Sequence, residues 1–435
     1  MEIIYKILRV LVDIGPVGLS SLFLLFLGLI ASRNKLILLR NALYTYLGLF
    51  SFSILLFFFV SFFTPIINMI ISNSDKKFQA IDVGWFIASN INIYNAYTIQ
   101  ILAVIIGVNI IMLFLRLTRT FNIDIWNLWI SLFSGLFIYG ITKIYWMGIL
   151  LAGVTASITF VMADIYAPYV DNYYGLKGIS LPNPGSIAWA PVSSFVNFTF
   201  NKIPVIKKIN IFYEEIRYKL GIVGEPLITG FTFGFIIGFI TKFKELLSAF
   251  TWSDIGFCLY QGIYLSVLTI LIPRALTLLY KGLIPIINDV KIFINSKITK
   301  REIYIGLNPL IIAGNPSVIA LSTIMIPLSV YIATILPGNN VLPSADLVMI
   351  PILLVWAIGP SKGDIFRSFI SAIIIIPLVL LISTNMSDII TQFLSQDVSS
   401  QIVKGYNEVS SLGMGSNLIF WILSQILKPL IKFFS

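Results

Sequence analysis

The sequence predicts an all-α polytopic membrane protein with about ten or eleven transmembrane helices and re-entrant hairpins. Of its 435 residues, 58% are apolar and only 11% are Asp, Glu, Lys or Arg. That charged fraction is less than half the roughly 25% of an ordinary soluble domain. A soluble chain of this length must expose many residues to water and cannot bury so much apolar surface. The composition therefore excludes a soluble enzyme, a nucleic-acid-binding protein and a disordered scaffold.

The charged and metal-binding residues narrow the class further. The chain carries 29 Lys and Arg against 19 Asp and Glu. In a membrane protein this balance is typical of cations in cytoplasmic loops, next to anionic lipid headgroups. Histidine is absent and Cys258 is the one cysteine, so neither a disulfide framework nor a thiolate metal site is expected. We expect no metal, no cofactor and no nucleic-acid partner.

Uncharged stretches of about 20 residues or more mark the expected spans. They lie at 13–33, 40–75, 82–116, 124–143, 143–164, 225–242, 254–274, 302–346, 346–362, 367–388 and 408–428. Two of these stretches, 40–75 and 302–346, are longer than one span. Each must therefore fold back as a hairpin or contain two elements.

The order of the spans and polar gaps predicts three regions. They are a first transmembrane half at 1–163 with a re-entrant segment near 80–95, a cytoplasmic loop at 164–221, and a second half at 222–435 with an amphipathic segment at 274–302 and a re-entrant segment near 305–318. The loop at 164–221 and the segment at 274–302 are both rich in Lys and Arg, which favours the cytoplasmic side. No cleavable signal is expected at the N-terminus, because no small-residue cleavage site follows the first apolar run.

The two halves resemble each other. The stretch at 13–32 is similar to 221–241, and "IDVGWFIASN" at 81–90 occupies the place that "IGLNPLIIAGN" at 305–315 occupies in the second half. This pattern predicts an inverted repeat, the common architecture of alternating-access transporters. Short apolar runs also resemble one another by accident, so chance similarity is the alternative.

Three polar breaks within apolar stretches are the candidate binding elements, because free backbone groups cannot face lipid. The first contains Asp82, Trp85, Ser89 and Asn90. A carboxylate and an indole ring together are typical of a site for vicinal hydroxyls and the C–H face of a polyol. The alternative is a loop cap beside an interfacial tryptophan.

The second break is Gly224-Glu225-Pro226, at the start of a very apolar segment. Glu225 is the first candidate for a catalytic base and Asp82 the second, because an acid in a membrane segment is costly and usually functional. Pro226 is expected to contact the substrate. The alternative for Glu225 is a helix cap that complements the helix dipole.

The third break holds two Asn-Pro pairs, which interrupt a helix twice. Asn308, Asn315 and Ser317 are the expected substrate-binding residues here. A half-helix that begins near Ser317 would direct its positive end and the Asn315 amide at a ligand oxygen. Two structural kinks are the alternative. We expect all three breaks to line one cavity near the middle of the bilayer.

The motifs at these breaks resemble one family when taken together. They are "KLGIVGEPLITGFTFGFIIG", "YYGLKGISLPNPGSIAWAPV", "VGW" after Asp82, "YIGLNPLIIAGNPSVIALSTIMIPLSVYIATILPGNNVLPSADL" and "GDIFRS". In this order and spacing, from about residue 10 to 395, they resemble the galactitol-type permease (IIC component) of the bacterial phosphoenolpyruvate-dependent phosphotransferase system. A more distant relation to ascorbate permeases of the same superfamily follows.

The resemblance implies a function and partners. In such systems the multi-pass permease of the bacterial inner membrane binds a sugar or polyol from outside. A separate cytoplasmic IIB subunit, itself supplied by IIA, then donates a phosphoryl group from a phosphocysteine. A homodimer is also implied. The family commonly has Asp at the Asn308 position and His at the Asn315 position, so this chain either takes a substrate other than galactitol or places the base at Glu225 or Asp82.

Two other functions fit the sequence. An ion-coupled secondary transporter of a small polar solute would use Glu225 and Asp82 as coupling-ion sites, and a membrane-embedded transferase would need no transport. The basic stretches 164–221 and 274–302 favour the phosphotransferase permease, because they offer a docking surface to an acidic cytoplasmic partner. Uptake driven by an ion gradient alone would identify the secondary transporter instead.

Overall fold

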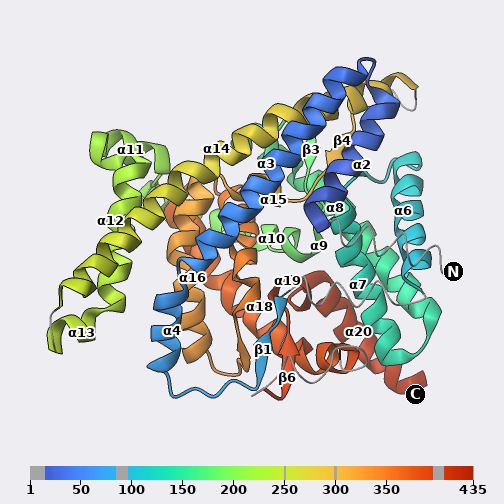
Figure 1. Cartoon of the computed structure of the whole chain (residues 1–435). Coiled ribbons are helices and arrows are strands. Elements are labelled where there is room, and N and C mark those ends of the chain that lie inside the picture. Colours follow the sequence, from blue (N-terminus) through green and yellow to red (C-terminus); the bar gives the residue numbers. More distant parts are fainter. Residues whose placement is uncertain (1–14, 85–96, 249–250, 298–300, 395–405, 435) are drawn as a thin grey trace.

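The structure is a computed structural model that describes residues 15–84, 97–248, 251–297, 301–394 and 406–434 (Figure 1). It is mostly helical, as the sequence predicts. In the described residues five helices are long and apolar enough to cross a membrane: Lys35–Ser72, Tyr145–Tyr174, Trp252–Lys297, Pro316–Ile335 and Ile365–Gln392. Tyr213–Gly224 and Pro226–Thr241, bent by 85° at Glu225, would together count as a sixth. Further apolar helices are shorter: Ser20–Ala31, Thr98–Phe114, Ile125–Gly140, Ala345–Ile358 and Leu418–Leu427.

Four helices, which we call the support helices, run along one side of the molecule, diagonally in the view of Figure 1. They are α2 (Gly15–Ala31), α3 (Lys35–Ser61), α12 (Pro226–Thr241) and α14 (Trp252–Lys297). The backbones of α3 and α14 approach closely at two glycines. A side chain at Gly48 would overlap the Leu279 backbone, and one at Gly282 would overlap the backbone at Asn41. Small residues commonly allow such close packing of membrane helices.

The remaining helices surround two small parallel sheets. They are α4 (Thr64–Ser72), α6 (Thr98–Phe114), α7 (Ile125–Thr142), α8 (Tyr145–Tyr174), α10 (Ala190–Lys202), α16 (Pro316–Ile335), α17 (Met349–Ile358), α18 (Ile365–Leu394) and α20 (Leu418–Phe434). Their apolar faces form one continuous core with the support helices, which includes the fully buried rings of Phe52, Phe59 and Trp356.

The two sheets have matching topologies. Sheet A has the order β5-β1-β6 and sheet B the order β2-β4-β3. The strands are β1 (Ala80–Asp82), β2 (Thr120–Asn122), β3 (Ile179–Ser180), β4 (Tyr304–Gly306), β5 (Val341–Leu342) and β6 (Glu408–Ser410). If β1, β2 and β3 are exchanged with β4, β5 and β6, respectively, the strand order of sheet A becomes that of sheet B. β3 and β4 lie at the upper end of the view and β1 and β6 at the lower end (Figure 1).

Strands of both sheets lead into helical turns. β2 leads into α7, β3 into α9 (Pro184–Ile187), β4 into α15 (Leu310–Ala313), β5 into η4 (Ala345–Val348) and β6 into α19 (Leu412–Gly415). β1 leads to Gly84, where the described segment ends. Because all pairings within a sheet are parallel, the residues that follow its strands gather at one edge.

The stretch expected to be a cytoplasmic loop and the stretch expected to be an amphipathic segment both contain regular structure. Residues 164–221 include the end of α8, β3, α9, α10, η2 (Ile206–Lys208) and α11 (Tyr213–Leu220), and Trp189 within them is fully buried. The segment at 274–302 is helical to Lys297 as the continuation of α14, and Leu283, Ile287 and Val290 are buried in the core. The helix α13 (Phe243–Ser248) completes the described elements between α12 and α14.

Candidate functional site

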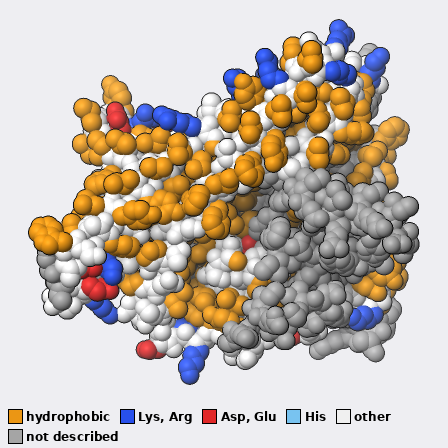
Figure 2. Space-filling model, in the orientation of Figure 1, with side chains coloured by type: hydrophobic (Ala, Val, Ile, Leu, Met, Phe, Trp, Pro, Cys, Tyr) orange, Lys and Arg blue, Asp and Glu red, His pale blue; other side chains and the backbone are white. Residues whose placement is uncertain are grey.

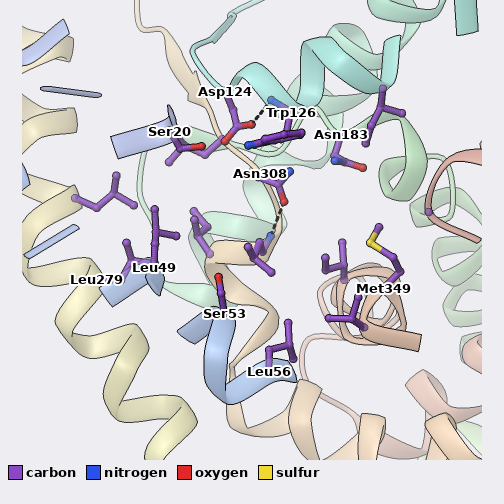
Figure 3. Close-up of a pocket in the computed structure, with 18 of the residues that line it drawn as sticks. Ser20, Leu49, Ser53, Leu56, Asp124, Trp126, Asn183, Leu279, Asn308 and Met349 are labelled. Carbon is purple, nitrogen blue, oxygen red and sulfur yellow. Dashed lines mark hydrogen bonds between the residues drawn. The ribbon is translucent and has the colours of Figure 1, made fainter. Parts of the chain in front are cut away.

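A cavity of about 270 Å³ lies where the strand ends of the two sheets meet the support helices (Figure 3). It is near the small end of the range for ligand pockets, which is about 300–1,000 Å³. The residues that follow β2, β3 and β4 line it from sheet B, and those that follow β5 and β6 line it from sheet A. Side chains of α2, α3 and α14, among them Ser20, Ser53 and Leu279, close it.

The Asp124 carboxylate is the ionisable group among the described residues that line the cavity. It caps the N-terminus of α7 and accepts hydrogen bonds from the backbone N–H groups of Trp126 (2.8 Å) and Asn127 (3.4 Å). The backbone N–H of Asn308 also donates to it. Its side chain is 8% exposed, and burial disfavours a charged carboxylate, whereas N–H donors favour it. Asp124 therefore joins the strand ends of β2 and β4.

Trp126, Asn183 and Asn308 surround Asp124 on the same wall of the cavity (Figure 3). Asn308 follows β4, and its Oδ1 accepts a hydrogen bond from the backbone N–H of Leu310 at 2.9 Å. Asn183 follows β3, and its Nδ2 donates to the Asn127 Oδ1 at 3.3 Å. Carboxylate and amide groups beside a flat indole ring are the combination that binds hydroxyls and a C–H face together.

Asn183 presents an unsatisfied acceptor. The residue is 1% exposed, and its Oδ1 has no hydrogen-bond partner. Leaving a buried polar atom unpaired costs about 1–3 kcal/mol. Asn183 also lines the cavity, and a donor group that reaches this oxygen would recover that free energy.

The opposite side of the cavity is mostly apolar, with Ser53 beside the leucines of α3. Figure 3 shows Leu49, Leu56 and Leu279 across the cavity from the polar wall. From sheet A come Val348, Met349, Ile352, Gly413 and Met414. The cavity therefore has one face for hydroxyl groups and one for carbon-bound hydrogens. Within the described residues, no cluster of three or more Cys, Asp or Glu side chains is placed to hold a metal ion.

Asp82, expected to act as a base, lies at the end of β1 and does not line this cavity. It is 1% exposed, and its Oδ1 accepts from the backbone N–H groups of Gly84 (3.1 Å) and Leu412 (3.3 Å). Its Oδ2 accepts from those of Ser344 (3.2 Å) and Asp346 (2.7 Å). Four donors from three chain segments occupy this carboxylate, which joins the strand ends of sheet A.

The other expected residues lie in different places. Glu225 is exposed at the 85° bend before α12, and Pro226 begins that helix; neither lines the cavity. Asn315 caps α16 by accepting from the Ser317 backbone N–H at 3.0 Å, and the Ser317 Oγ accepts from the Tyr173 hydroxyl at 2.9 Å. Asn308 is the expected residue that reaches the cavity. Trp85, Ser89 and Asn90, which were also expected to bind substrate, lie outside the described residues.

Sequence reasoning did not select Asp124, Trp126 or Asn183, although each carries a signal. Asn183-Pro184 is an Asn-Pro pair like the two pairs at 308–309 and 315–316. Asp124 and Trp126 repeat the carboxylate and indole combination that drew attention to Asp82 and Trp85. Trp126 lies near the end of the expected span 124–143, where a tryptophan is usually interpreted as an interfacial anchor.

Comparison with known proteins identifies the family. Residues 11–402 match the sequence model of the family described as "EIIC-GAT: PTS system sugar-specific permease component". This match covers most of the chain and confirms the resemblance inferred from the ordered motifs.

Individual relatives agree with this match. The chain is 27% identical over 424 residues to the "PTS system galactitol-specific EIIC component" of Escherichia coli (strain K12), covering 98% of this chain and 91% of the relative. The galactitol-specific component of Escherichia coli O157:H7 matches to the same extent. A "Putative permease IIC component" of Escherichia coli (strain K12) is 30% identical over 363 residues, covering 83% of this chain and 80% of that protein.

Proposed function

The chain belongs to the family of sugar-specific permease components of the phosphotransferase system and is a multi-pass membrane protein. From this premise we propose that it imports a galactitol-like sugar or polyol. A separate cytoplasmic IIB subunit phosphorylates that substrate during uptake. The galactitol-specific relatives support the substrate class. The two-faced cavity carries the proposal, because a polyol has hydroxyls to meet Asp124 and Asn183 and C–H groups to meet Met349 and Met414.

The proposed reaction transfers a phosphoryl group from the IIB phosphocysteine to a substrate hydroxyl. The hydroxyl oxygen forms a bond to phosphorus, the sulfur–phosphorus bond breaks, and the thiolate leaves with the IIB subunit. The hydroxyl proton needs an acceptor as the oxygen attacks. We assign this role to Asp124, since its carboxylate lines the cavity. Glu225 is the second candidate, and it would have to approach the substrate from its exposed bend.

The proposed architecture is an inverted repeat. The matching strand orders of sheets A and B support it, as does the correspondence of β1 with β4, the same segments that resemble each other in sequence. We propose ten or eleven spans, for which the five long apolar helices, the bent pair and the five shorter apolar helices are the candidates. We extend the proposal to a homodimer, for which the exposed apolar side chains of α12, such as Phe233 and Phe239, are the candidate contact.

Sheet B is proposed to face the cytoplasm. Arg116, Arg119, Lys177 and Arg301 lie just before its strands, whereas Lys76 and Lys77 are the described cations before the strands of sheet A. The cytoplasmic side of a membrane protein carries the excess of Lys and Arg. Figure 2 shows Lys and Arg side chains gathered along the upper edge, over α11 and over the turn between α2 and α3, with fewer at the lower edge.

Uptake into membrane vesicles tests this function. Right-side-out vesicles that contain the permease should accumulate labelled galactitol phosphate when IIB, IIA and the general phosphodonor proteins are enclosed with phosphoenolpyruvate. Vesicles without IIB should accumulate no phosphorylated product. Accumulation of free galactitol driven by a proton or sodium gradient alone would contradict the proposal and favour a secondary transporter.

A further inference from the structure

The outer edge of sheet B carries a concentration of positive charge that the cavity does not use. Because the strands are parallel, the residues before them lie together at the edge opposite the cavity. In register, Arg119 and Lys177 both lie beside Ile303, since Thr120 pairs with Tyr304 and Ile179 with Ile305. Neighbouring strands are about 4.8 Å apart, so the two cationic residues begin about 10 Å from each other across β4.

Arg116, Lys291 and Arg301 lie at the same edge as Arg119 and Lys177. We call these five residues the basic rim. The Arg301 guanidinium donates to the Arg116 carbonyl at 3.2 Å. The Lys291 side chain of α14 lies over Gly178, where any larger residue would collide with its ammonium group. Segments that are distant in sequence therefore bring their cations to one place.

The rim is held in position by a few carboxylate contacts. Arg119 forms an ion pair with Glu302 at 3.2 Å, and its guanidinium lies over the Tyr304 ring at 4.9 Å from the centroid. The Asp164 carboxylate accepts from the Arg119 backbone N–H at 2.7 Å and from the hydroxyl of Thr120 at 2.7 Å. Within the described part of the rim, its five cations accompany the carboxylates of Glu302 and Asp164. Among the described residues at the corresponding edge of sheet A, Lys76 and Lys77 are matched by Asp75 and Glu408.

We propose that the basic rim is the docking surface for the phosphorylated IIB subunit, an inference that rests on the proposed function. The rim is positively charged and lies at the edge proposed to face the cytoplasm, so it is complementary to an acidic surface on this cytoplasmic partner. The strands that begin at this rim end at Asp124, Asn183 and Asn308 on the cavity wall. A protein bound at the rim is therefore held over the substrate.

The distance defines the role of the rim. Arg119 and Asp124 are five residues apart along β2 and its extension, which spans about 17 Å at about 3.3 Å per residue. The rim cations are thus too far away to contact the reacting phosphoryl group. They bind and orient the partner, while the cavity residues bind the substrate. Contact with anionic lipid headgroups is the other use of such cations.

Charge reversal in detergent solution tests the docking surface without lipid. We would measure binding of purified phospho-IIB to the full-length permease by biolayer interferometry at about 50 mM and about 500 mM salt. Lys177→Glu and Arg116→Glu, both at exposed side chains, should each weaken binding about ten-fold or more at low salt. The difference from wild type should shrink at high salt, because charges are screened. Galactitol binding by the same variants should be unchanged, which also shows that they are folded.

Lys77→Glu is the matched control, because Lys77 is exposed just before β1 of sheet A. It should leave IIB binding unchanged. The docking surface is wrong if Lys177→Glu and Arg116→Glu bind phospho-IIB like wild type, if Lys77→Glu weakens binding equally, or if rim variants bind IIB normally and lose only retention on anionic vesicles. If wild-type permease does not bind phospho-IIB at all, the proposed function itself fails, and the docking proposal with it.

Discussion

At the scale of single residues, Asp124 combines a structural and a chemical role. Its carboxylate caps α7 and holds the backbone of Asn308, while one side of it faces the cavity. Asn is as good a helix cap as Asp, because its side-chain oxygen accepts the same hydrogen bonds. Asp124→Asn therefore separates the two roles, since it keeps the cap and removes the base.

We predict that Asp124→Asn lowers the rate of galactitol phosphorylation by about 10²–10⁴-fold, the usual cost of a lost general base. Substrate affinity should change by much less, because the amide keeps most of the hydrogen bonding. The measurement is single-turnover transfer from phospho-IIB to labelled galactitol on the purified permease. Glu225→Gln is the companion variant and should transfer at the wild-type rate. The opposite pattern, with Glu225→Gln inactive and Asp124→Asn active, would assign the base to Glu225.

A second residue prediction concerns the unpaired oxygen of Asn183. Asn183→Ala should weaken galactitol binding by about ten-fold, because a hydrogen bond of about 1–1.5 kcal/mol to a substrate hydroxyl is lost. Ser193→Ala is a matched control: Ser193 also has a buried, unpartnered side-chain oxygen, but it lies on α10 and does not line the cavity. Calorimetric titration compares the two variants. Equal affinity in the Asn183 and Ser193 variants would remove Asn183 from the site.

At the scale of elements, the short strands explain how polar groups reach the interior of a membrane protein. Strands of two or three residues satisfy only a few backbone groups, so their ends require side-chain partners. Asp82 and Asp124 are these partners, and each joins segments from different strands. Polar breaks of this kind are therefore structural junctions first, and a subset of them also lines a cavity.

The contact between α12 and α14 provides an element-scale prediction. Gly230, Gly234 and Gly238 form a stripe along α12 that meets α14, and a side chain at Gly234 would overlap the Gln261 backbone. Gly234→Ala should lower the thermal midpoint of the detergent-solubilised protein, because overpacking costs about 1–3 kcal/mol. Gly256→Ala on α14 meets no atom within 4 Å and should leave the midpoint unchanged or raise it, since Ala is the better helix former. Fluorescence-detected melting of both variants checks this, and equal midpoints would contradict the close packing.

At the scale of the whole molecule, the orientation of the two sheets is the testable quantity. Lys77 precedes sheet A and Lys177 precedes sheet B, and both are exposed. We predict that a membrane-impermeant maleimide labels Lys77→Cys on intact cells and labels Lys177→Cys only after permeabilisation. The native Cys258 is fully buried, so wild type serves as the unlabelled control. Labelling of Lys177→Cys on intact cells, with Lys77→Cys labelled only after permeabilisation, would contradict the proposed topology.

Much of the fold was predictable because the apolar stretches that form membrane helices can be recognised in every part of the sequence. The apolar stretches predicted a helical membrane protein, and the similarity between 81–90 and 305–315 marked two segments that begin in the central strands of the two sheets, β1 and β4. The number and length of the spans were less certain. Length alone does not distinguish a crossing helix from a shorter apolar helix, such as α7 or α17, that follows a short strand or a helical turn inside the molecule.

The candidate site was only partly predictable. Asn308 was expected from its Asn-Pro pair and lies on the cavity wall, whereas Asp124, Trp126 and Asn183 were interpreted as span boundaries, anchors or loop residues. Asp124 and Trp126 follow β2 whereas Asn183 follows β3, and 59 residues separate Asp124 from Asn183. No local pattern reports that two such residues meet, because the pairing of β2, β4 and β3 brings them together.

The sequence by itself determined that this protein lies in a membrane, that it belongs to a sugar permease family, and that its polar groups concentrate at a few breaks in apolar helices. These properties depend on composition and on ordered local motifs, which remain readable without a structure. Only the tertiary structure decided which breaks face a common cavity and which are saturated by their own backbone. Asp82 and Asp124 both follow short parallel strands, yet four backbone donors fill the first carboxylate while the second borders a cavity. That difference arises from contacts between segments far apart in the chain.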